Sequence, residues 1–162
     1  VNIALGDETV ACDEVHGAPL DVAAIARPDT PSASTSSDVI AVPLVALAWG
    51  RSGDKGNKAN IGIIARRPEY LPYICDALTE AAVRARFAHF LADASAGSVE
   101  RFVLPGAHAI NFLLHDVLGG GGVASLRNDP QGKGYAQLLL SCPIPMPGKL
   151  AKTVAATTGE NV

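Results

Sequence analysis

Apolar residues follow two different periods along the middle of the chain. Short runs rich in β-branched and aromatic residues are typical of strands, and such runs occur at residues 39–49, 60–65, 98–104, 123–127 and 135–142. Apolar positions three to four residues apart are typical of amphipathic helices, and they occur at residues 68–78, 79–91 and 108–118. The pattern predicts an α+β sandwich, in which a mostly antiparallel sheet carries helices on one face.

The two ends of the chain lack such periods. Residues 27–38 are rich in Pro, Ser and Thr and have too little apolar surface to offset the entropy of ordering them, so we predict a linker there. Residues 147–162 are small, polar and aperiodic, which predicts a mobile tail. The expected organisation is an N-terminal arm and linker at 1–38, a folded domain at 39–146 and a flexible tail at 147–162.

Composition narrows the class of function. A chain of 162 residues that is 48% hydrophobic is long enough for one core of ordinary size. Its net charge of −3 and its lack of a basic run argue against nucleic acid as a partner. No apolar run is long enough to cross a membrane. Cys12, Cys75 and Cys142 lack metal-ligand spacing, so we expect no metal site and interpret them as reduced thiols of a cytoplasmic protein.

Residues 51–62 carry the densest chemistry of the chain, between two apolar runs. Cations and glycines together suit an anionic partner, because the glycines let a ligand approach the backbone closely. The alternative is a hairpin loop whose polar side chains satisfy their own backbone. The candidate ligand-binding residues here are Arg51, Ser52, Gly53, Asp54, Lys55, Gly56, Asn57 and Asn60.

A second candidate cluster follows in the segment that we predict to be helical. His108, Asn111 and His115 are three and four residues apart, so on a helix all three meet one ligand. The alternative is that the two histidines only cap the helix ends. The glycines of residues 119–122, among them Gly120 and Gly121, exceed what a helix end needs. Arg127 and Lys133 flank a later turn and are weaker candidates.

Three stretches in this order resemble a known family. They read AWGRSGDKGN at residues 48–57 with ANIG at 59–62 and AR at 65–66, then LPGAHAINFLLH at 104–115 and GGGG at 119–122, and finally SLR at 125–127 with DPQGK at 129–133. Residues 42–146 thereby resemble the AtuA-like ferredoxin-fold domain, which usually forms the C-terminal part of acyclic terpene utilisation AtuA proteins. Three separated motifs in the correct order are more specific than one glycine-rich loop.

The resemblance implies a ferredoxin-like two-layer sandwich that takes part in the breakdown of citronellol- or geraniol-type terpenoids, or in related acyl-CoA catabolism. The several hundred residues that precede this domain in the family are missing here. The chain is therefore either a small subunit that assembles with a larger partner or an excised C-terminal fragment.

Two functions follow from these observations. In the first, the chain is an accessory domain or small subunit without a cofactor, which docks a larger AtuA-type subunit or further copies of itself in a homo- or hetero-oligomer. In the second, the Arg51–Asn60 loop and the His108–His115 helix converge on a CoA thioester or another carboxylated metabolite. Arg51, Lys55 and Lys133 would then hold its anionic groups, and His108 or His115 would act as general acid or base.

Overall fold

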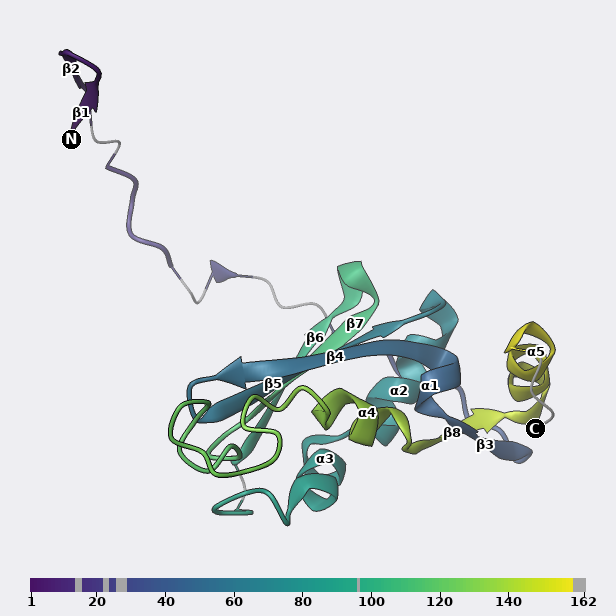
Figure 1. Ribbon diagram of the computed structural model, residues 1–162. Coiled ribbons are helices and arrows are strands. Elements are labelled where there is room, and N and C mark those ends of the chain that lie inside the picture. The colour runs from purple at the N-terminus through teal and green to yellow at the C-terminus, as the bar shows by residue number, and fades with distance from the viewer. Residues whose placement is uncertain (14–15, 22–23, 26–28, 96, 159–162) are drawn as a thin grey trace.

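The fold is built around a four-stranded antiparallel sheet (Figure 1). Its strands lie in the order β4-β5-β7-β6 and comprise β4 (Ala48–Lys55), β5 (Lys58–Ala65), β6 (Val99–Leu104) and β7 (Ala109–Leu114). The computed structural model describes residues 1–13, 16–21, 24–25, 29–95 and 97–158. The predicted hairpin of two neighbouring strands is formed by β4 and β5, which pair from Ala48 with Ala65 to Lys55 with Lys58.

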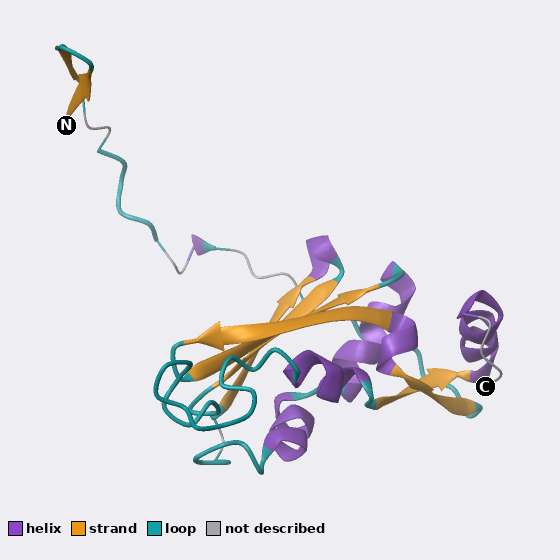
Figure 2. Ribbon diagram, viewed as in Figure 1, coloured by secondary structure: helices purple, strands orange, loops and turns teal. Residues whose placement is uncertain are grey.

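Helices cover one side of this sheet (Figure 2). They are α1 (Leu44–Leu47), α2 (Leu71–Ala77), α3 (Glu80–Phe87) and α4 (Tyr135–Leu140). Single 3-10 turns precede α2 and β7, at η2 (Pro68–Tyr70) and η3 (Pro105–Ala107). Thr79 caps α3 as its position predicts, because its hydroxyl oxygen accepts a hydrogen bond from the Ala82 N–H at 3.1 Å. The predicted α+β sandwich with helices on one face is confirmed.

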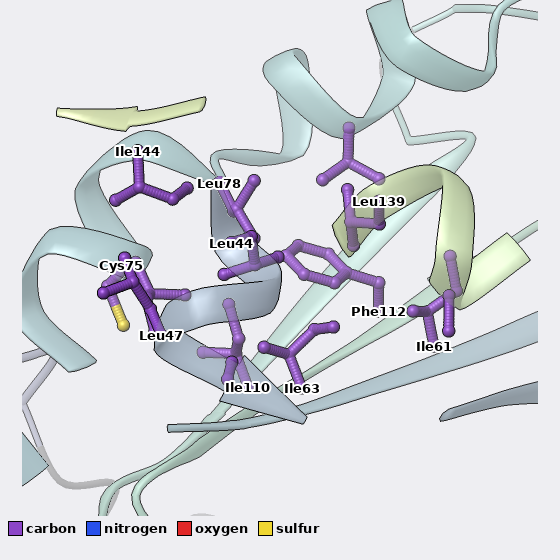
Figure 3. Packing of buried hydrophobic residues seen from close by; sticks show 14 of the residues in the cluster. Leu44, Leu47, Ile61, Ile63, Cys75, Leu78, Ile110, Phe112, Leu139 and Ile144 are labelled. Atoms are coloured by element: carbon purple, nitrogen blue, oxygen red, sulfur yellow. The ribbon is translucent and has the colours of Figure 1, made fainter. Parts of the chain in front are cut away.

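The hydrophobic core lies between the sheet and these helices (Figure 3). Ile61 and Ile63 of β5, with Ile110 and Phe112 of β7, point from the sheet toward Leu44, Leu47 and Leu139 of the helical layer; all seven side chains are almost fully buried. The inner side chains of the two central strands, β5 and β7, therefore pack against the helical layer and form the middle of the core.

The predicted helix at residues 108–118 is wrong, because residues 109–114 form the central strand β7. Ile110 and Leu114 are four residues apart and suit both periods, but Phe112 between them is fully buried as well. That alternation belongs to a strand. Leu113 on the other side of β7 is apolar as well, so the run from Ala109 to Leu114 is apolar at every position except Asn111. Periodicity alone does not distinguish such a short apolar run from a segment of a buried helix.

Residues 135–142 differ from the prediction in the opposite sense. They were expected to form a strand but contain helix α4, which buries Tyr135, Ala136 and Leu139 on one side. Residues 123–127 form no strand. The run 39–49 is also interrupted, because α1 separates β3 (Val39–Pro43) from β4. Short apolar runs do not distinguish a strand from a helix, and packing decides between them.

A small second sheet joins the two ends of the domain. In it β3 pairs antiparallel with β8 (Pro143–Pro147), so that Val42 lies opposite Ile144 and both are buried. The segment predicted to be a mobile tail instead forms helix α5 (Gly148–Thr158), in which Ala151 and Val154 join the core cluster. No helix in the described part of the chain is long and apolar enough to cross a membrane.

The predicted arm contains the hairpin of β1 (Asn2–Leu5) and β2 (Glu8–Ala11), whose residues are all exposed and which stands apart from the sheet (Figure 1). The end of the predicted linker contacts α2, because the Ser34 hydroxyl lies 2.7 Å from the Tyr73 hydroxyl. Parts of the predicted arm, linker and tail lie outside the described residues, namely 14–15, 22–23, 26–28 and 159–162.

Candidate functional site

Most of the candidate segment at residues 51–60 lies in strands rather than in a free loop. Arg51 to Lys55 belong to β4 and Lys58 to Asn60 belong to β5, so only Gly56 and Asn57 make the turn. Gly56 has a φ of +65°, which glycine adopts without strain. Successive side chains of β4 therefore point to opposite sides of the sheet.

Asn57 joins the hairpin turn to the glycine run at residues 119–122. Its side-chain oxygen accepts a hydrogen bond from the Gly120 N–H at 2.7 Å, and its amide nitrogen donates to Asp116 at 3.0 Å. Its backbone carbonyl accepts the Val117 N–H at 3.1 Å. The structure thus brings two of the predicted motifs together, but their polar groups bind each other.

The glycines in this contact serve close packing. Gly121 is buried and has a φ of +97°, and a Cβ atom there would lie 3.1 Å from the Gly56 carbonyl oxygen. We therefore expect Gly121→Ala to lower the free energy of unfolding by about 1–3 kcal/mol, through backbone strain and the clash with Gly56. Urea denaturation followed by circular dichroism measures this change.

Gly106→Ala is the matched control for that substitution. Gly106 is exposed, its φ is not positive, and a Cβ atom there would meet no atom within 4 Å. We expect it to change stability by less than about 0.5 kcal/mol. Equal effects of the two substitutions would show that the glycine run is not packed on the hairpin turn.

Ser52 is a second link between the candidate motifs. It is buried on the helix side of β4, where its hydroxyl donates to the Gly132 carbonyl at 2.6 Å and accepts from the Ala136 N–H at 2.9 Å. Ser52 therefore fixes the start of α4 to β4 and does not face a ligand.

Lys133, which is also a predicted ligand-binding residue, lies beside β4. Its Nζ is 3.8 Å from an Asp54 carboxylate oxygen. A Cβ atom placed on Gly53 would lie 3.0 Å from the same nitrogen.

Arg127 is also occupied by the protein. Its guanidinium donates to the backbone carbonyls of Val117 at 2.5 Å and Phe90 at 3.0 Å, and lies 5.7 Å from the centre of the Phe90 ring. Nearby, the Asp129 carboxylate accepts hydrogen bonds from the Lys133 and Gly134 N–H groups. Arg127 and Asp129 therefore stabilise the backbone conformation of the segment between β7 and α4.

The predicted convergence of His108, Asn111 and His115 does not occur. His108 lies in the turn before β7 with a φ of 49°, and His115 follows the other end of the strand. At about 3.3 Å per residue they are on the order of 20 Å apart. Asn111 lies between them and accepts a hydrogen bond from the Asn60 amide at 2.8 Å. His115 Nε2 lies 2.5 Å from a Glu100 carboxylate oxygen.

We call the side of the four-stranded sheet that faces away from α1–α4 the open face. The pairing register places one row of side chains across it from Trp49 through Ile64 and Ala109 to Leu104. The next row runs from Arg51 through Gly62 and Asn111 to Phe102, and a third from Gly53 through Asn60 and Leu113 to Glu100. The open face is therefore apolar at one end and polar toward the hairpin turn.

The large apolar residues of this face are unusually exposed. The exposed fractions are 55% for Trp49, 49% for Ile64, 44% for Phe102 and 48% for Leu104. The sequence analysis did not identify this cluster. The alternation of side chains along β6 could have revealed it. Val99, Arg101 and Val103 face the helices, so Phe102 and Leu104 between and after them face the other side.

Other reactive groups have structural roles. Burial raises the pKa of the Cys75 thiol, although the Arg101 guanidinium nearby acts in the opposite direction. Burial likewise raises the pKa of the Cys142 thiol. Both thiols are therefore poor nucleophiles. Among the described residues, no three His, Cys, Asp or Glu side chains gather as metal ligands would.

A pocket of about 720 Å³ lies away from the open face, between the end of α3, the start of α4 and the preceding segment. Phe90, Leu126, Tyr135 and Leu138 line it together with Arg127. Arg127 is the one predicted ligand-binding residue in the wall of this pocket, and its guanidinium is already bound to two carbonyls.

The comparisons with known proteins agree with the architecture. Residues 42–145 match the model of the AtuA ferredoxin-like domain. No curated protein and no solved structure matches the chain. The match spans the four-stranded sheet, its helices and all three sequence motifs.

Proposed function

The chain belongs to the AtuA ferredoxin-like domain family, and on that premise we propose that it is an accessory domain or small subunit that docks a larger AtuA-type partner. The docking surface is the open face of the sheet. The pathway we propose is the catabolism of acyclic terpenes such as citronellol and geraniol, or related acyl-CoA catabolism, as the resemblance of the three sequence motifs implies. The chain contributes binding to this pathway rather than a reacting group.

The exposed apolar end of the open face is the observation that supports docking. Trp49 of β4 is paired with Ile64 of β5. Across the small side chain of Ala109 in β7 lies Leu104 of β6, and Phe102 is two residues before Leu104 on the same side of that strand. Full burial of one such side chain contributes roughly 1.5–3 kcal/mol. An apolar cluster of this kind on a sheet is typical of surfaces that a partner covers.

The alternative, a CoA thioester or other carboxylated ligand, has weaker support. Small-molecule sites are concave and enclose most of their ligand, whereas the cations of β4 lie on a sheet surface. Ser52, Asn57, Arg127 and Gly121 are used for packing within the chain. The two histidines lie at opposite ends of β7. They therefore cannot both contact the reacting atoms of one bound molecule.

Trp49→Ser tests the docking proposal. Trp49 is about half exposed in the free chain, so we expect the substitution to weaken binding to a larger AtuA-type subunit about tenfold. Calorimetric titration of that subunit with the purified chain measures the affinity. The fold should be unaffected, because the Trp49 ring contacts the Arg66 guanidinium on the surface and is not in the core cluster.

Leu126→Ser is the matched control. Leu126 is a fully exposed apolar residue of the segment that precedes α4, away from the open face. We expect it to leave the affinity within about twofold. Wild-type chain that gives no heat with the larger subunit, or equal weakening by both variants, would contradict docking through the open face.

A further inference from the structure

The open face carries a line of cations beside its apolar end. Arg66, Arg51 and Lys58 lie on the two hairpin strands or directly after them, with Lys55 next to the turn. Arg51, Lys55 and Arg66 are exposed, and Lys58 is half-buried. Since side chains alternate along a strand, all four share the face of Trp49 and Ile64.

These cations lack acidic partners in the described part of the chain. The ion pairs among the described residues join Arg67 to Glu69, His115 to Glu100 and Lys133 to Asp54. Lys55 Nζ donates to the backbone carbonyl of Asp54, and the Arg66 guanidinium lies 4.7 Å from the centre of the Trp49 ring. The β4–β5 half of the open face is thus cationic, although the chain as a whole has a net charge of −3.

We infer that the surface which covers the open face is acidic, with apolar residues over Trp49, Ile64, Phe102 and Leu104 and carboxylates over Arg51, Lys55 and Lys58. This inference rests on the proposed docking function and adds the chemistry of the partner. The cations of the open face attract carboxylates of the partner during its approach. The same cations disfavour binding of surfaces that lack carboxylates.

The same distribution argues against a second copy of this chain as the occupant. Two open faces stacked with their β4–β5 halves together place cations against cations. With the halves crossed, the cations meet β6 and β7, where the carboxylate of the open face, Glu100, is already held by His115. Neither arrangement supplies the carboxylates that Arg51, Lys55 and Lys58 require.

The test is the rate of association with a larger AtuA-type subunit, measured by stopped flow with the full chain. For Lys55→Glu/Lys58→Glu we expect association about tenfold slower than wild type at about 0.05 M salt. At about 1 M salt, where the screening length falls to about 3 Å, the difference should vanish. Arg51→Glu should act in the same direction.

Lys149→Glu/Lys152→Glu is the matched control, because it changes the net charge equally on the exposed side of α5. It should associate within about twofold of wild type. Equal rates for both double variants, with wild-type binding intact, overturn the acidic partner but leave docking standing. Analytical ultracentrifugation tests for a dimer of the chain. A dimer that Trp49→Ser dissociates would overturn the acidic partner in favour of a second copy of the chain. Absence of any binding overturns the proposed function and this inference together.

Discussion

Phe112→Ala is expected to lower the free energy of unfolding by about 3–5 kcal/mol, the cost of removing a large aromatic side chain from a packed core. Phe112 is fully buried in the middle of β7, and it pairs with Ile61 on one side and Arg101 on the other. The helices cover it from above (Figure 3). Urea denaturation at equilibrium, followed by far-ultraviolet circular dichroism, measures the loss.

The neighbouring residue provides the control for this prediction. Leu113 is only half-buried and lies on the open face, so Leu113→Ser should cost less than about 1.5 kcal/mol. In a helix over residues 108–118 the order reverses, because Leu113 would join Ile110 and Leu114 in the core and Phe112 would face outward. A larger loss for Leu113→Ser than for Phe112→Ala would therefore contradict strand β7.

Ser52→Ala is expected to lower the free energy of unfolding by about 2–3 kcal/mol, because it leaves buried polar groups without partners. The Ala136 N–H loses its acceptor and the Gly132 carbonyl loses a donor, both of them at the start of α4. The Lys133 carbonyl loses a weaker contact at 3.1 Å. Hydrogen exchange at the Ala136 amide should accelerate together with the loss of stability.

Ser34→Ala is the comparison for Ser52→Ala. The Ser34 hydroxyl also makes one hydrogen bond over a long sequence separation, to Tyr73, but that bond is exposed to water. Its removal should cost less than about 0.5 kcal/mol, because water replaces the lost partner. Similar costs for the two serines would mean that Ser52 does not anchor α4.

Local signals predicted much of the fold because they depend on neighbouring residues. The helix after Pro68, the cap at Thr79 and the β4–β5 hairpin each follow from propensities within about ten residues. The strand β6 was also predicted within one residue of its observed start. The segments 108–118 and 135–142 were exchanged between helix and strand, since a short apolar run satisfies either period.

The candidate site could be predicted only in part, for a related reason. The sequence identified which polar residues and glycines are unusual, but not which partners they have. Asn57 and Gly121 bind across the turn to each other's segments, and Arg127 binds two carbonyls. The contacts of Asn57 with Gly120 and of Arg127 with Phe90 join residues 63 and 37 positions apart in the sequence. Composition and the spacing of nearby residues therefore do not predict them.

By itself the sequence determined the family, the α+β class and the concentration of chemistry in three motifs, because these depend on residue identity and order. The tertiary structure alone decided that β7 is a central strand, which separates His108 from His115. It decided that Ser52 is buried on the helix side of β4 and that Asn57 binds Asp116 and Gly120. It also decided that Trp49, Ile64, Phe102 and Leu104 gather on the open face. Strand pairing sets which side chains become neighbours, and pairing is a property of the whole fold.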